Sequence, residues 1–124
     1  MRAAPNTDTG IELLKGEKMK ICVTAKGNDL SSETDPRFGR CGFFVFYDTE
    51  TEKYEFCKNE YAADSGGAGT KSGSFVAEKG ARLVITGRVG PNAERVLSAA
   101  GITVIPDVKG SVEEAVKNSG YKKN

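Results

Sequence analysis

The chain has 124 residues, enough for one domain with its own hydrophobic core. Its 18 Lys and Arg residues nearly balance its 17 Asp and Glu residues, which argues against a general nucleic-acid-binding protein. The sequence contains no histidine, which excludes Ser-His-Asp and Cys-His catalytic systems and every His-containing metal site. No apolar run reaches the length of a membrane span, and the N-terminus lacks the apolar core of a signal peptide.

Three cysteines, Cys22, Cys41 and Cys57, form no CxxC pair. This spacing does not indicate a disulfide framework, and free thiols favour a reducing compartment. We therefore expect a cytoplasmic protein without a membrane partner. The polar stretch before Met19 predicts a poorly ordered N-terminal extension over residues 1–18, and residues 19–124 then form a single domain.

The first half of that domain has the patterns of three strands. A short β-branched run covers residues 20–24, and an aromatic-rich run covers residues 42–47. Residues 53–57 alternate between apolar and polar side chains, as in a half-buried strand. The polar segment 48–52 is typical of a turn, so the second and third strands are predicted to form an antiparallel hairpin.

The second half alternates between helices and strands. Glycines precede the first helix, proline fits the first position of the second, and a Ser-x-x-Glu capping box begins the third. The predicted elements are a helix over 66–79, a strand over 82–86, a helix over 91–100, a strand over 102–105 and a helix over 111–118.

The element order βββαβαβα predicts an α/β protein with a mixed five-stranded sheet and helices on both faces. If the first and fourth strands are parallel neighbours, the strand order is 3-2-1-4-5. The loops that follow these two strands then share one edge of the sheet, where open α/β sheets bind ligands.

The loop before the second strand is the first candidate for such a site. It contains Arg37, Phe38, Gly39, Arg40 and Cys41, and proline and glycine restrict or permit its turns. Loops on rigid scaffolds often carry binding residues. The alternative is an ordinary connecting loop with scattered surface charge.

Two predicted helix starts add further candidates. Gly66, Gly67 and Gly69 open one helix, but Thr70 stands where a P-loop requires glycine before Lys-Ser, and Ser72 stands where the dinucleotide-binding pattern requires its third glycine. What remains is a helix N-terminus whose backbone N–H groups suit an anion. The alternative is a closely packed helix entry.

The second helix start combines Arg88, Gly90 and Asn92. Together with Arg37 and Arg40, these residues predict a pocket for a negatively charged ligand. The alternative is a well-formed helix start with Arg88 at the surface.

Cys41 follows Arg40 directly, and nearby positive charge favours the thiolate form of a cysteine. A thiolate is a ligand for soft metals and iron–sulfur species. Cys41 is therefore the candidate metal ligand, with a half-buried packing role as the alternative.

Several motifs, in this order and spacing, resemble the dinitrogenase iron–molybdenum cofactor biosynthesis family. They are Arg37-Phe38-Gly39-Arg40-Cys41, Phe43-Phe44-Val45-Phe46-Tyr47-Asp48, Gly66-Gly67-Ala68-Gly69, Gly87-Arg88-Val89-Gly90-Pro91-Asn92-Ala93, Ala100-Gly101-Ile102-Thr103-Val104 and Gly110-Ser111-Val112-Glu113-Glu114-Ala115-Val116. The resemblance implies a ribonuclease-H-like fold and a small stand-alone member of the family. It also implies carriage of an iron–sulfur or iron–molybdenum cluster, or its precursor, among cofactor-assembly proteins. Some family carriers use a histidine that this chain lacks, so the resemblance leaves Cys41 as the soft ligand.

Three functions follow from these observations. The first is a non-catalytic carrier of an anionic metal cluster, acting as a monomer or homodimer. The second is a regulatory or scaffold module that binds an anionic metabolite or a protein partner at the same edge of the sheet. The third is a metal-dependent nuclease, which needs carboxylates clustered around metal ions.

Overall fold

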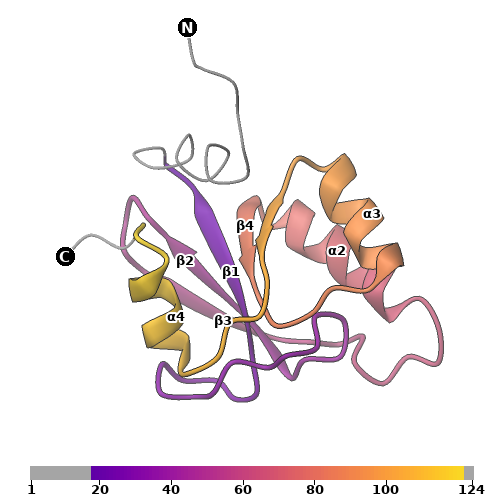
Figure 1. Cartoon of the computed structure of the whole chain (residues 1–124), viewed down its shortest axis with the longest axis horizontal. Helices are drawn as coiled ribbons and strands as arrows, with labels where there is room; N and C mark the ends of the chain where they lie inside the picture. The colour runs from indigo at the N-terminus through magenta and orange to yellow at the C-terminus, as the bar shows by residue number, and fades with distance from the viewer. Residues whose placement is uncertain (1–17, 122–124) are drawn as a thin grey trace, which may run out of the picture.

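A computed structural model describes residues 18–121 of the chain, and its centre is one five-stranded sheet (Figure 1). The predicted succession βββαβαβα is confirmed. The elements are β1 (Lys20–Ala25), β2 (Phe43–Asp48), β3 (Tyr54–Lys58), α2 (Ala68–Glu78), β4 (Ala81–Ile85), α3 (Pro91–Ala99), β5 (Thr103–Ile105) and α4 (Val112–Asn118).

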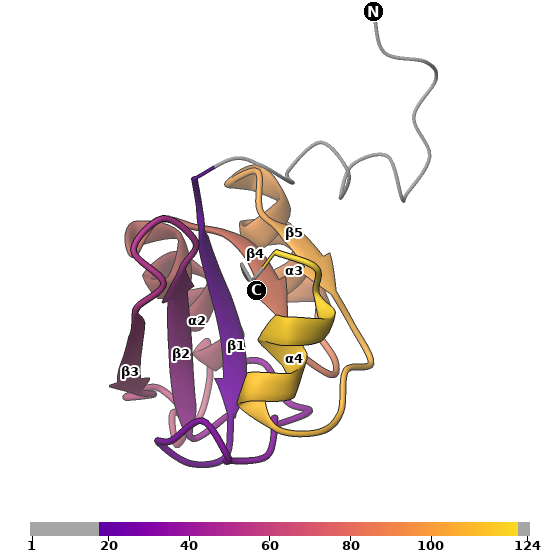
Figure 2. The same cartoon turned by 90° about the vertical axis from the view of Figure 1, so that its left-hand side faces the viewer.

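The strand order β3-β2-β1-β4-β5 confirms the predicted topology. β2 pairs antiparallel with both β1 and β3, whereas β4 pairs parallel with both β1 and β5. The connections from β3 to β4 and from β4 to β5 are crossovers through α2 and α3, which lie together on one face of the sheet (Figures 1 and 2). The last helix, α4, lies on the other face. This order agrees with the ribonuclease-H-like fold that the resemblance implies, and the name of that fold stays a prediction.

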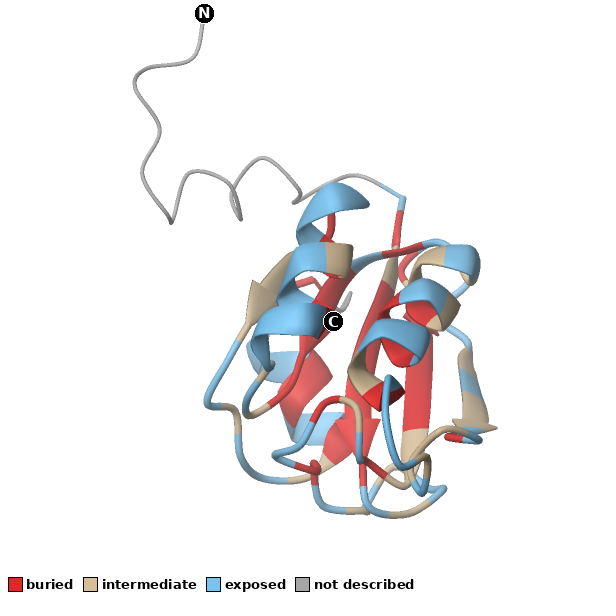
Figure 3. Cartoon of the chain, turned by 90° about the vertical axis from the view of Figure 1, so that its right-hand side faces the viewer, coloured by how far each residue is buried: buried red, intermediate tan, exposed pale blue. Residues whose placement is uncertain are grey.

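The sheet separates two hydrophobic cores, because successive side chains of a strand point to opposite faces. In β1, Ile21 and Val23 pack with α4, whereas Cys22 packs with α2 and α3. All three are fully buried, and Figure 3 shows the buried strand interiors between helices whose outer faces are exposed. Both faces of the sheet are therefore covered, as predicted.

The expected N-terminal extension over residues 1–18 lies almost entirely outside the described residues, so it stays a prediction. Within residues 18–121, no helix combines the length and apolar character that crossing a membrane requires.

Candidate functional site

The loops that leave β1 and β4 meet at one edge of the sheet. The backbone N–H of Arg88 donates to the carbonyl of Pro36 at 2.7 Å, and the N–H of Phe38 donates to the carbonyl of Arg88 at 3.1 Å. Gly87 makes this approach possible, since a Cβ there would lie 2.5 Å from the Cα of Pro36. The predicted meeting of the two loops is confirmed.

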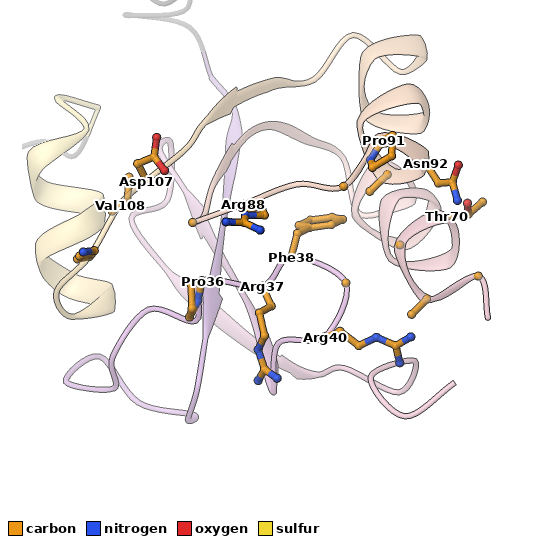
Figure 4. Close-up of a pocket in the computed structure, with 18 residues that line it drawn as sticks. Pro36, Arg37, Phe38, Arg40, Thr70, Arg88, Pro91, Asn92, Asp107 and Val108 are labelled. Carbon is orange, nitrogen blue, oxygen red and sulfur yellow. The ribbon is translucent and has the colours of Figure 1, made fainter. Parts of the chain in front are cut away.

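A pocket of about 670 Å³ opens where these loops meet the N-termini of α2 and α3 (Figure 4). Nine of the eleven predicted site residues line it, and Gly66 and Cys41 do not. The nine are Arg37, Phe38, Gly39, Arg40, Gly67, Gly69, Arg88, Gly90 and Asn92. Phe38 is 2% exposed and packs its ring against Phe44, with 5.8 Å between ring centres, so it supplies an apolar part of the wall.

Both helices that start at the pocket lack a side-chain cap from any described residue. The N-cap of α2 is Gly67, whose φ of 79° is a left-handed conformation that favours glycine. The N-cap of α3 is Gly90, followed by Pro91 at the first helical position. The first-turn N–H groups therefore remain available, and the dipole of each helix adds partial positive charge beside the pocket.

The start of α4 differs from these two. Ser111 and Glu114 form a complete capping box, in which each side chain accepts from the other residue's backbone N–H. This helix start therefore pairs its own donors, whereas the two at the pocket have no side-chain acceptor among the described residues.

Arg37 is held by a buried carboxylate. Its Nε and Nη2 donate to the two carboxylate oxygens of Asp35 at 3.1 and 3.2 Å, and its backbone N–H donates to the same carboxylate. These hydrogen bonds and the charge of Asp35 raise the pKa of Arg37. The side chain of Asp35 is 2% exposed and that of Arg37 is 65% exposed, so Arg37 is fixed in place and still reaches solvent.

Arg40, Arg88 and Lys109 complete the positive lining, and all three are exposed. No ion pair joins any of them to a carboxylate within the described part of the chain. Arg40 instead donates to two backbone carbonyls, those of Ala62 and Asp64. Asp107 is the one carboxylate in the lining, so among the described residues the pocket has a clear excess of positive charge.

Asn92 is oriented by its neighbour on α3. Its Oδ1 accepts a hydrogen bond from Arg95, which fixes the orientation of the amide. The N–H groups of the side-chain amide remain as donors for the pocket that Asn92 lines.

The predicted lowering of the Cys41 pKa is wrong. Burial, followed by the charge of Asp35, raises the pKa of this thiol to about 12. Its Sγ donates to the carbonyl of Phe38 at 3.1 Å and is fully buried. Arg40 precedes Cys41 in the same loop, but its side chain extends toward the connection before α2. Its charge therefore does not lie beside the sulfur, although the two residues are adjacent in sequence. Ligation of a metal by Cys41 is an expectation from the sequence alone, and the burial and raised pKa of this thiol do not favour it.

Sequence reasoning missed Asp107 and Lys109, which come from the connection between β5 and α4. A signal was present, because β5 is parallel to β4 and its carboxyl end had to reach the same edge of the sheet. It also missed Asn59, whose side-chain nitrogen donates to the carbonyls of Gly39 and Cys41 at 3.0 and 2.9 Å. Nothing in the local sequence around Asn59 marks this long-range role.

The carboxylate cluster that a metal-dependent nuclease needs is not found among residues 18–121. Within that range, no three or more Cys, Asp or Glu side chains lie close enough together to hold a metal ion.

The fold and the pocket define an α/β protein with a pocket lined by an excess of cations at the carboxyl ends of β1 and β4. Residues 19–120 match the model of the family described as dinitrogenase iron-molybdenum cofactor. The chain belongs to this family.

Similar proteins agree with this assignment. An uncharacterized protein of Methanocaldococcus jannaschii is 32% identical over 109 residues, which cover 86% of this chain and 89% of that protein. The apo form of the orange protein from Desulfovibrio gigas is 39% identical, with a TM-score of 0.78 over 82% of this chain and 87% of that one. A NifB-like protein from Thermotoga is 35% identical, with a TM-score of 0.74 and the same coverage.

Proposed function

We propose that the protein binds an anionic iron–sulfur or iron–molybdenum cluster, or a precursor of one, and carries it without catalysing a reaction. The observation that carries this proposal is the convergence of two uncapped helix N-termini on one pocket lined by arginines. Membership of a family named for the iron–molybdenum cofactor supports a metal–sulfur ligand over other anions. The partners would be the proteins that supply and receive the cluster during cofactor assembly.

The ligand is held by hydrogen bonds and charge rather than by direct coordination. The residues that line the pocket include no cysteine or methionine, and the sequence contains no histidine. Their donors are arginine and lysine side chains, the amide of Asn92 and backbone N–H groups. Such donors interact with the outer sulfur or oxygen atoms of an anionic cluster and leave its metal ions unligated by protein.

The size of the pocket supports a ligand larger than a simple oxyanion. At about 670 Å³ it falls within the range of small-molecule sites, and Phe38 adds an apolar surface to its polar donors. A compact cluster with several peripheral acceptor atoms can contact both helix starts and the arginines together.

The test is anaerobic reconstitution with iron and sulfide, and separately titration with tetrathiomolybdate, each followed by visible absorbance. Wild type, Cys41→Ser, Arg88→Gln and Lys53→Gln are compared. Lys53 is exposed in the turn between β2 and β3, so Lys53→Gln loses the same charge outside the pocket. We expect wild type, Cys41→Ser and Lys53→Gln to bind alike, and Arg88→Gln to bind about tenfold more weakly, as the loss of a charge-assisted hydrogen bond predicts.

Loss of uptake in a folded Cys41→Ser variant would show that the thiol is a metal ligand and would overturn outer-sphere binding. Equal uptake by all four proteins would remove the pocket as the site. Tighter binding of inorganic phosphate than of tetrathiomolybdate would favour the regulatory module for an anionic metabolite.

A further inference from the structure

The side chain of Arg40 ties the middle of the connection between β3 and α2, residues 59–67, to the pocket. Nη1 of Arg40 donates to the carbonyl of Ala62 at 2.7 Å and to that of Asp64 at 2.6 Å. Both hydrogens of this nitrogen are thus used. We refer to residues 59–67 as the connector, and its last residue, Gly67, is the N-cap of α2.

Other contacts also restrain the connector, and one of them packs the ring of Tyr61 against Phe75 of α2, with 6.3 Å between ring centres. At its start, Asn59 donates to the carbonyls of Gly39 and Cys41, and this side is buried. Further along, the carboxylate of Asp64 pairs with Lys71 at 2.8 Å, in an exposed ion pair of small energetic weight. Between these two points, Arg40 is the side chain that links the connector backbone to the pocket loop.

The guanidinium of Arg40 has donors to spare. Its Nε and Nη2 make no hydrogen bond to any described residue, and Arg40 lines the pocket. A guanidinium presents five N–H donors in a fixed plane, so one edge can hold carbonyls while another engages an anion. An anion on the Nε and Nη2 edge would lock the plane and keep Nη1 aimed at Ala62 and Asp64.

We propose that Arg40 couples occupancy of the pocket to the order of the connector. A bound polyanion fixes the guanidinium, and the guanidinium in turn fixes residues 60–66 and the N-terminus of α2 that follows them. The loaded protein then holds the connector more tightly than the empty protein does, and a protein that receives the cargo could recognise this difference. This inference rests on the proposed function, because the coupling requires an anionic ligand in the pocket.

The experiment measures amide exchange and ¹⁵N relaxation of residues 60–66 by NMR, with and without tetrathiomolybdate, whose molybdenum(VI) is diamagnetic. Wild type should show amide exchange in this segment slowed by at least about fivefold on binding, the lower end of common couplings between sites. Arg40→Lys keeps the charge but has no planar fork. It should bind the probe more weakly and, at probe concentrations raised until this variant is saturated, show no slowing.

Two matched variants separate coupling from a general structural role. Arg88→Lys makes the same change from arginine to lysine at a pocket position with no hydrogen bond to the connector among the described residues. Once saturated with probe, this variant should keep the slowing. Lys71→Ala removes the ion pair to Asp64, so exchange should become faster in both states while the ligand-dependent slowing remains.

The possible failures are distinguishable. Binding of the probe by wild type with unchanged or faster exchange in residues 60–66 overturns the coupling and leaves the proposed function standing. Slowing that persists in Arg40→Lys also overturns it. Absence of binding by wild type overturns the proposed function, and the coupling falls with it.

Discussion

Thr24 and Thr86 lie side by side beneath the pocket, at the carboxyl ends of β1 and β4. The hydroxyl of Thr24 donates to the carbonyl of Asp35 at 2.7 Å, and the two hydroxyl oxygens are 2.7 Å apart. Since the Thr24 hydrogen is used on Asp35, Thr86 must be the donor between the two hydroxyls. The pair is fully buried and fixes the start of the loop that places Arg37.

This order of donors predicts unequal effects of two isosteric substitutions. Thr24→Val removes the partner of both the Asp35 carbonyl and the Thr86 hydroxyl, and should lower the free energy of unfolding by about 1–3 kcal/mol. Thr86→Val removes one donor to Thr24 and should cost less. Urea denaturation of both variants checks the prediction, and a larger loss in Thr86→Val would contradict it.

Cys41 gives a pH dependence whose sign follows from its burial. Its pKa is raised from 9.0 to about 12, and the pKa of the fully buried Cys22 is raised as well. Below pH 9 both states keep these thiols protonated and the stabilisation is complete. Between about pH 9 and 12 the unfolded chain ionises them while the folded chain does not, so stability falls as pH rises.

We therefore expect the free energy of unfolding to decrease from pH 8.5 to pH 10.5, and to decrease less steeply in Cys41→Ala. Chemical denaturation at a series of pH values measures both slopes. Lys71 and Lys79 also have a raised pKa, and the stabilisation that they contribute also decreases as pH rises. The comparison with Cys41→Ala therefore isolates the contribution of the thiol. Identical slopes would show that Cys41 ionises alike in both states.

At the scale of elements, α3 begins at a residue that has no capping side chain, although a capping side chain would fit there. Gly90 has φ −76° and ψ 170°, an extended conformation open to any residue, and a Cβ there would meet no atom within 4 Å. Asp and Asn are strong N-caps, so either would fit this position better than glycine as far as the helix is concerned. The helix forgoes the cap at the point where its N-terminus faces the pocket.

Gly90→Asp should accordingly raise stability by a few tenths of a kcal/mol and weaken anion binding. A carboxylate at about 6 Å from a bound anion costs about 3 kcal/mol at an effective dielectric constant of about 20, so affinity should fall by at least about tenfold. Thermal unfolding and tetrathiomolybdate titration measure the two effects. Gly90→Asn, a neutral cap of the same shape, is the control and should retain more affinity than Gly90→Asp.

Most of the elements could be predicted from the sequence, because their signals are local. The alternation in residues 53–57, proline at position 91 and the capping box at Ser111 each act within a few residues, and each predicted element was found. The pocket was predictable in outline, since the strand order brings the loops after β1 and β4 to one edge. The surroundings of individual side chains were not predictable in this way.

Cys41 illustrates that limit. Whether Arg40 lies against the thiol or extends to the carbonyls of Ala62 and Asp64 depends on a segment more than twenty positions away in the chain. Asp35 and Arg37 are only two positions apart, but the backbone of their loop is held by hydrogen bonds to Thr24 and Arg88. Long-range packing decides both arrangements, and no local pattern encodes it.

At the scale of the whole molecule, charge is distributed unevenly. The formal net charge of the chain is +1, yet four cations and one carboxylate line the pocket. At this pocket the local excess of cations, and not the overall charge, attracts an anion.

The affinity for tetrathiomolybdate should fall as salt rises. The screening length falls from about 14 Å at 0.05 M NaCl to about 4 Å at 0.5 M NaCl. This range covers the distances between charges within the pocket. Titrations at several NaCl concentrations should show a steady loss of affinity, with a shallower slope in Arg88→Gln than in wild type. An affinity independent of salt would indicate that apolar contacts, such as those of Phe38, dominate binding.

The uncapped starts of α2 and α3 have a consequence for how this site tolerates change. Their donors belong to the main chain, so replacing a side chain in the first turn does not delete them as long as the helix persists. Substitution of the arginines can then change the affinity and selectivity of anion binding. The backbone N–H donors remain in every variant that keeps the fold.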